Sequence, residues 1–164
     1  MKLLADRGHE RIAHVTYRAD ATAYDIAAKR AGYEDGIDRA SLSYRKILAF
    51  AHAPDKRVLD EVLACSPRPT AVMASESTLG LAIVRTAAER GVSIPEELAL
   101  ISFDDGDLGD VTTPRMSSVH AFGAELGRLA VRAMLGRLDG DVTERVDEVL
   151  PCEIVEREST ARRP

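Results

Sequence analysis

The chain has 164 residues, of which 45% are hydrophobic and 30% charged, with a formal net charge of −5. This balance is typical of one globular domain with its own core and excludes disordered and fibrous classes. A sequence pI near 5.4 indicates no excess of basic residues for contact with phosphates, so we expect that this chain does not bind DNA by itself. We interpret the C-terminal arginines as a solvated tail and not a phosphate grip: Arg157, Arg162 and Arg163.

Alternating strand and helix patterns fill the first two thirds of the chain. Residue patterning predicts strands at 11–17, 45–50, 69–74 and 98–103, and helices at 2–6, 21–37, 54–64 and 76–90. The last of these helices has Leu79, Ile83 and Ala87 on one apolar stripe, and Gly91 is well placed to end it. The strand at 98–103 is almost uniformly apolar, which indicates burial on both faces.

The regular alternation of strands and helices ends after Asp105. Residues 106–115 form a polar loop, 116–119 a short extended piece, 123–138 a helix and 148–156 a last strand. The helix at 123–138 carries a row of apolar residues that must bury against something.

The alternation predicts an α/β fold with a mainly parallel open sheet and helices on both faces. We expect one α/β unit over residues 1–164. Ligands of such sheets bind at the carboxyl ends of the strands, where Phe103 is followed by Asp104 and Asp105.

Cysteine usage and the N-terminus favour a cytoplasmic protein. Cys65 and Cys152 lie far apart with no histidine cluster beside them, so we expect reduced thiols and no zinc site. The apolar run at 3–5 is too short for a signal peptide or a membrane span. The four histidines show no ligand spacing, and we expect no metal or other cofactor: His9, His14, His52 and His120.

Several short motifs, taken in order, resemble the LacI/GalR family of bacterial transcriptional regulators. They are residues 7–13, Gly32-Tyr33, residues 68–72, residues 91–95, Phe103-Asp104-Asp105, Thr113-Pro114 and residues 150–159. The resemblance implies one lobe of a periplasmic-binding-protein-like bilobed domain that senses a small-molecule effector. The helix-turn-helix headpiece and the first lobe of that family are not recognised in this sequence, so DNA contact would need a headpiece outside it.

The resemblance also implies that the segment 119–142 crosses to the first lobe. The apolar helix within it would then lack its partner, which predicts swapping, self-association or disorder. A homodimer is implied through the helix at 76–90 and the loop at 108–114. No membrane contact is expected.

Asp104 is the strongest candidate for a ligand residue. Its carboxylate can accept hydrogen bonds from neighbouring hydroxyls or ring N–H groups, which suits sugars, polyols and nucleosides. The resemblance assigns the same role to this first Asp, whereas capping of the next turn is the alternative. Asp105 is interpreted as structural, because consecutive side chains on an extended strand point to opposite faces.

Three other positions are ligand candidates by resemblance. The family has an Arg three residues before the Gly of its Gly-Tyr motif, and this position is Lys29 here, with Arg30 beside it. A lysine lacks the planar fork of an arginine, and a solvated helical face is the alternative. Phe50 falls where an aromatic packs against the effector ring, and its alternative is a core residue that ends a strand.

Glu76 and Ser77 align with an Asn-Asp pair of the family at the start of a helix. They can bond a ligand hydroxyl, and helix capping or solvent exposure is the alternative.

No nucleophile elbow, P-loop or dinucleotide-binding turn is found, so we expect no enzyme. The resemblance implies that the chain is the effector-sensing and dimerisation domain of a LacI-type regulator that binds a sugar, polyol or nucleoside. The first rival is a lobe of a solute-binding protein of a sugar transport system, and the second is an α/β enzyme.

Overall fold

The structure is a computed structural model, and it describes residues 1–18, 24–51, 57–140 and 145–161. The first residues of two predicted helices, 21–23 and 54–56, lie outside these ranges. His52, Arg162 and Arg163 lie outside them as well. The elements in order are α1 (Lys2–Asp6), β1 (Ile12–Tyr17), α2 (Tyr24–Arg39), β2 (Lys46–Phe50), α3 (Arg57–Leu63), β3 (Ala71–Ala74), α4 (Ser77–Arg90), β4 (Ala99–Phe103), α5 (Leu108–Val111), β5 (Ser117–His120), α6 (Gly123–Leu138) and β6 (Glu153–Val155), before a 3₁₀ turn at Glu158–Thr160.

One six-stranded sheet organises the chain, with strand order β2-β1-β3-β4-β5-β6. The first five strands are parallel, and β6 runs antiparallel to β5. This confirms the predicted α/β class with a mainly parallel open sheet. Because the strands β1 to β5 run the same way, their carboxyl ends meet at one edge of the sheet, which is called the carboxyl edge below.

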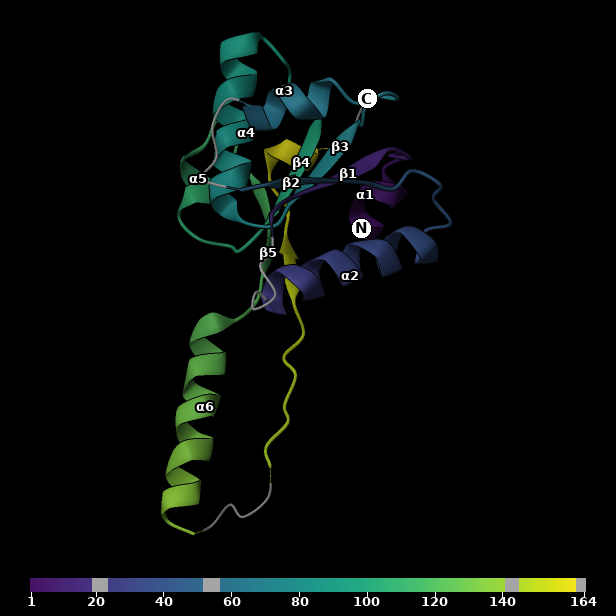
Figure 1. Cartoon of the computed structure of the whole chain (residues 1–164). Helices are drawn as coiled ribbons and strands as arrows, with labels where there is room; N and C mark the ends of the chain where they lie inside the picture. The colour runs from purple at the N-terminus through teal and green to yellow at the C-terminus, as the bar shows by residue number, and fades with distance from the viewer. Residues whose placement is uncertain (19–23, 52–56, 141–144, 162–164) are drawn as a thin grey trace.

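Helices cover both faces of the sheet (Figure 1). On one face, α3 and α4 contribute Leu59, Leu79 and Ile83 to a core cluster with Val72 and Leu100 of the sheet. On the other face, α1 and α2 build a second cluster on the neighbouring strand positions: Leu4, Ile12, Tyr33, Ile37, Ala71, Met73, Ala99 and Ile101. Alternation along each strand therefore sends successive side chains to different helices.

The local sequence explains the bounds of α4. Its predicted stripe is buried, with Leu79, Ile83 and Ala87 each at most 1% exposed. Gly91 ends the helix in the left-handed conformation with φ of 66°, as its position predicts. The helix begins at Ser77, with Glu76 at the N-cap.

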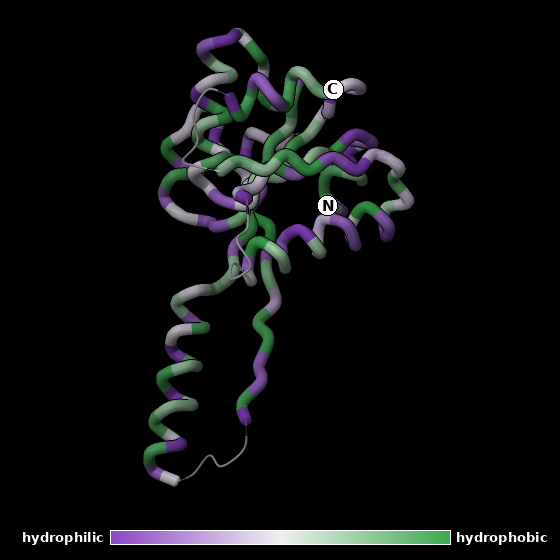
Figure 2. The backbone as a smooth tube through the Cα atoms, viewed as in Figure 1, coloured by the Kyte–Doolittle hydropathy of each residue, from purple (hydrophilic) through white to green (hydrophobic). Residues whose placement is uncertain are grey.

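The helix α6 stands away from the sheet, and residues 145–152 run back beside it (Figure 1). These two segments, 123–138 and 145–152, are called the arm below. No residue of α6 is buried. Hydrophobic and hydrophilic residues alternate along the helix in Figure 2. Its exposed large apolar residues are Leu126, Val131, Met134, Leu135 and Leu138.

Three predictions about the chain after β4 are corrected. The last strand is shorter than 148–156, because residues 145–152 belong to the arm and lie beside no other strand of the described residues, so pairing is confined to β6. Arg157 is not part of a solvated tail: its side chain is 10% exposed, and it is paired with Asp105 and Asp110. The loop 106–115 also contains one helical turn, α5.

Among the described residues, no helix is both long and apolar enough to cross a membrane.

Candidate functional site

Polar residues from three elements meet at the carboxyl edge. Asp104 follows β4, Glu76 follows β3, and Lys29 reaches the same edge from α2. The electrostatic neighbours of Glu76 are Lys29, Asp104 and Asp25. The structure therefore brings together three of the six predicted ligand residues and adds Asp25, which sequence reasoning missed.

Tyr33 fixes α2 over the sheet and thereby positions Lys29. The Tyr33 hydroxyl donates to the carbonyl oxygen of Ile12 at 2.8 Å and accepts from the backbone N–H of Lys46 at 3.0 Å. Since Lys29 lies four residues before Tyr33, the two share one face of the helix.

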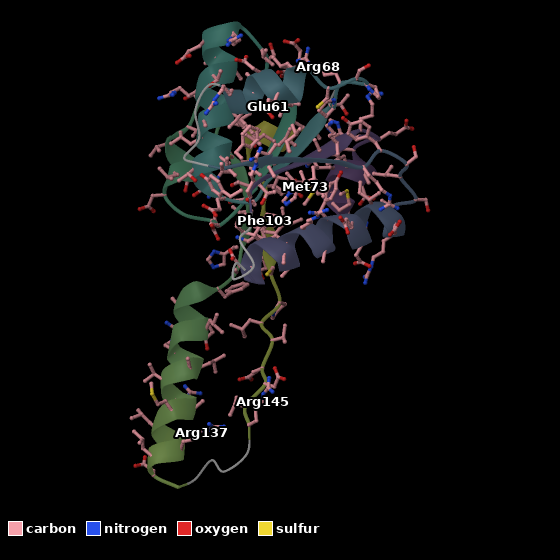
Figure 3. The ribbon with its side chains drawn as sticks, in the orientation of Figure 1. Glu61, Arg68, Met73, Phe103, Arg137 and Arg145 are labelled. Carbon is pink, nitrogen blue, oxygen red and sulfur yellow. The ribbon has the colours of Figure 1, made fainter. Side chains whose placement is uncertain are left out.

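The Lys29 ammonium is already engaged by the protein. It lies 3.6 Å from a carboxylate oxygen of Asp25 and 5.8 Å from the centroid of the Phe103 ring, and the side chain is only 20% exposed. In Figure 3 the labelled Phe103 lies between the sheet and α2, on the side where Met73 also lies. An ammonium over an aromatic face is favourable because of the ring quadrupole.

Glu76 is half-buried at the N-cap of α4, and its side chain makes no capping hydrogen bond. Burial raises the pKa of the Glu76 carboxyl, and Asp104 and Asp25 act in the same direction, while Lys29 opposes them. The capping alternative therefore does not describe this side chain, which is left at the edge beside the other charges.

Asp104 has a left-handed backbone, with φ of 69°. This conformation costs free energy in any residue but glycine, although Asp and Asn tolerate it best. It turns the chain sharply at the end of β4 and leaves Asp104 exposed at the carboxyl edge.

Asp105 belongs to a half-buried polar cluster on β5 and the C-terminal segment. Its carboxylate accepts from the Ser118 hydroxyl, lies 2.9 Å from an Nη of Arg157 and lies 3.4 Å from Nδ1 of His120. Burial opposes ionisation of Asp105, but these hydrogen bonds and positive charges outweigh it and hold its pKa below the ordinary value. The structural interpretation of Asp105 agrees with this geometry.

The remaining predicted ligand residues are less well placed. Arg30 is exposed, and its Nε lies 3.3 Å from a carboxylate oxygen of Glu34, away from the edge. Phe50 ends β2 and packs against the core cluster under α3 and α4. Ser77 is half-buried in the first turn of α4, one residue after Glu76.

Two buried hydroxyls at the same edge were missed by sequence reasoning. Thr16 is 2% exposed and Ser75 is 0% exposed, and their hydroxyl oxygens have no hydrogen-bond partner among the described residues. Strand alternation places both on the α2 face. A small polar residue near the end of a buried strand is the signal that could have identified them.

The histidines within the described residues do not form a metal site, since no group of three His, Cys, Asp or Glu side chains there is arranged to hold an ion. His14 is fully buried and stacks on Tyr33, with ring centroids 5.3 Å apart. Its Nδ1 lies 3.0 Å from the carbonyl oxygen of Met73, whereas His120 packs edge-on against Phe122.

Residues 1–160 match the family described as periplasmic binding protein-like domain. The chain is 30% identical over 161 residues to the HTH-type transcriptional repressor PurR of Vibrio atlanticus and 29% identical over 160 residues to the HTH-type transcriptional regulator CelR of Thermobifida fusca. Each match covers 95% of this chain but 47% and 46% of the relative, so the chain spans about half the length of these relatives. A probable opine utilization operon repressor of Rhizobium rhizogenes is 31% identical, over 96% of this chain and 85% of that protein.

Solved structures show the same fold. A LacI family transcriptional regulator from Bifidobacterium animalis superimposes with a TM-score of 0.88 at 28% identity, over 99% of this chain and 59% of that one. The transcriptional regulator CelR in complex with cellobiose gives a TM-score of 0.80 at 29% identity, over 95% of this chain and 48% of that one.

Proposed function

The chain belongs to the periplasmic binding protein-like domain family, and on that premise we propose that it is the effector-sensing region of a LacI-type transcriptional regulator. Its curated relatives are HTH-type regulators and the aligned regions cover nearly all of this chain, which favours a regulator over a solute-binding protein of a transport system. The observation that carries the proposal is the meeting of Lys29, Glu76 and Asp104 at the carboxyl edge.

The ligand of this edge is a small polar molecule, and Asp104 is its principal contact. The Asp104 carboxylate is exposed at the end of β4 and is not part of the polar cluster in which Asp105 pairs with Arg157. A carboxylate offers several acceptor positions to hydroxyl or N–H donors, which suits a sugar, a polyol or a nucleoside. The relative CelR, solved with cellobiose, supports a sugar-like ligand.

The arm supplies the contact with the other lobe of the bilobed domain. It leaves the sheet between β5 and β6, and Leu126, Leu135 and Leu138 on α6 are 52%, 55% and 79% exposed. A soluble domain rarely exposes such a row unless it has a partner. Packing of the arm on a first lobe would bring that lobe over the carboxyl edge and close the site.

Regulation would follow from dimerisation. We place the homodimer contact on α4 and the loop around α5, where Val111 is 74% exposed. A ligand that binds one arrangement of the lobes more tightly than the other shifts the dimer toward it and so changes how the DNA-binding headpieces are presented. DNA is contacted only by those headpieces, and the protein acts in the cytoplasm, without catalysis.

The test is a ligand screen by NMR on the ¹⁵N-labelled chain with sugars, polyols and nucleosides. The expected result is a set of shifted amides at 74–78 and 103–106 with a millimolar or tighter dissociation constant, since half of a site binds weakly. Asp104→Asn weakens that binding at least tenfold. Asp107→Asn, an exposed acid in the same loop, serves as the matched control and leaves the binding unchanged.

Binding that survives in the Asp104→Asn variant would move the site away from this edge. A turnover product from any of the compounds would favour the enzyme.

A further inference from the structure

We propose that the ligand of the carboxyl edge carries a protonated amine, held by Glu76 and Asp104, and that Thr16 and Ser75 are further ligand-binding residues that form a hydroxyl floor beneath it. This rests on the proposed function only in taking that edge as the ligand site. The ligand class is an amino sugar or an amino polyol.

Within the part of the chain that the structure describes, the charges that act on Glu76 are unbalanced toward the negative. The charged groups that act on Glu76 are one ammonium, on Lys29, and two further carboxylates, on Asp104 and Asp25. Burial and the two carboxylates both raise the pKa of Glu76, so ionisation of Glu76 at this edge is energetically unfavourable. A cationic ligand offsets the repulsion between these carboxylates, whereas an anionic ligand increases it.

Lys29 is the strongest single charge that acts on Glu76, but its one positive charge does not balance the carboxylates of Glu76, Asp104 and Asp25 together. It is held by Asp25 at 3.6 Å and by the Phe103 ring, and it is paired within α2 at the (i, i+4) spacing. The nearby Arg30 is engaged with Glu34. The two ligand carboxylates are therefore open to a positive charge from outside the chain.

The floor follows from the strand register. Val15 of β1 pairs with Ala74 of β3, and the N–H of Ser75 donates to the carbonyl oxygen of Val15 at 2.8 Å, so Thr16 and Ser75 lie side by side. Ala74 in turn pairs with Ser102, which places Phe103 next in the same row.

This row faces α2, because Met73, two residues before Ser75, belongs to the cluster under α2, as does Phe103. The two buried hydroxyls thus lie beside the ring that Lys29 covers, at the strand ends from which Glu76 and Asp104 emerge.

Unpartnered buried hydroxyls are costly in a folded protein, because each loses its water contacts without replacement. Thr16 and Ser75 can each donate to and accept from a ligand hydroxyl. A molecule with both an amine and hydroxyl groups satisfies the carboxylates and the floor together, which a simple amine does not do.

The experiment compares ligands that differ in one group. The first series is D-sorbitol, D-glucamine and D-gluconate, and the second is D-glucose, D-glucosamine and D-glucuronate, each titrated into the ¹⁵N-labelled full chain near neutral pH. The expected result is at least tenfold tighter binding of an amine than of its neutral counterpart, with no binding of the carboxylates.

Variants assign this preference to residues. Glu76→Gln reduces the preference for the amine over its neutral counterpart to less than threefold. Glu34→Gln removes an equal charge from the outer side of α2 and leaves this preference unchanged. Ser75→Ala weakens binding of the amine and its neutral counterpart equally, by threefold to tenfold. Dispersed amide spectra establish that each variant folds.

Equal affinity for the neutral and amine members, or tighter binding of the carboxylates, overturns the proposal while leaving the proposed function intact. The proposal is also overturned if the wider screen finds a neutral or anionic ligand that binds while neither D-glucamine nor D-glucosamine binds. If no compound of any charge shifts residues 74–78 and 103–106, both this proposal and the proposed function fail.

Discussion

The guanidinium of Arg157 lies 2.9 Å from the carboxylate of Asp105, and this pair joins the C-terminal segment to the end of β4. The same guanidinium binds Asp110 at 2.8 Å through Nε and donates to the Ser118 hydroxyl at 2.7 Å. One side chain therefore ties together β4, α5, β5 and the residues after β6. Its partner Asp105 directly follows Asp104 in the chain.

Arg157→Ala should destabilise the chain strongly. Removing one partner of a largely buried ion pair leaves the other charge uncompensated, so we expect the free energy of unfolding to fall by about 3 kcal/mol in urea titrations. Arg128→Ala, which breaks an exposed pair with Glu125 on α6, should cost less than about 0.5 kcal/mol. Similar losses in the two variants would contradict the structural role of Arg157.

Gly109→Ala should destabilise the same cluster from another side. An added Cβ would lie 3.0 Å from the carbonyl oxygen of Met116 and 3.1 Å from an Nη of Arg157, and the backbone atom cannot swing aside. We expect a loss of about 1–3 kcal/mol, measured by urea unfolding.

The matched control is Gly127→Ala, because an added Cβ at Gly127 on α6 meets nothing within 4 Å. That variant should be neutral or up to about 1 kcal/mol more stable, since alanine is the better helix former. If Gly109→Ala matched it, the close approach at Gly109 would not be real.

Stability should fall in mild acid because of His14. Burial lowers the pKa of His14 below its ordinary value of 6.5, with Lys29 and Arg30 acting in the same direction and the hydrogen bond to Met73 opposing them. The unfolded chain then binds the proton more readily than the folded chain. The contribution of His14 is complete above about pH 6.5 and decreases as the pH falls toward the folded pKa, by at most about 1.4 kcal/mol per pH unit.

Urea unfolding at pH 7.5 and 5.5 measures this effect, and His14→Phe should reduce the difference between the two. Phenylalanine keeps a ring against Tyr33 and does not titrate. An unchanged pH dependence in the variant would assign the effect to other groups.

The chain should associate through two separate surfaces. The triple change of Val131, Leu135 and Leu138 to Gln removes the apolar face of the arm, and Val111→Asp disrupts the surface around α5. In sedimentation equilibrium each change alone should lower the average mass at high concentration, and only their combination should give a monomer throughout. A wild-type chain that stays monomeric at all concentrations would contradict both surfaces.

The sequence determined the architecture. Strands and helices alternate with short connections, and the buried strands are nearly uniform in apolar content, so a mainly parallel sheet covered on both faces was predictable. The position of Asp104 at a carboxyl edge followed from the same pattern, because parallel strands end together. The sequence left both Lys29 and Arg30 as candidates, and the position of α2 over the sheet distinguishes them, since Lys29 shares the face of the buried Tyr33.

Only the tertiary structure decided which polar groups meet. Arg157 looked like a member of a charged tail because its partners, Asp105 and Asp110, are distant in sequence, and no local pattern encodes such a pairing. The floor formed by Thr16 and Ser75 depends on the register between β1 and β3, which hydrogen bonds across the sheet fix. Strand spacing along the chain carries no information about that register, so these contacts come from packing alone.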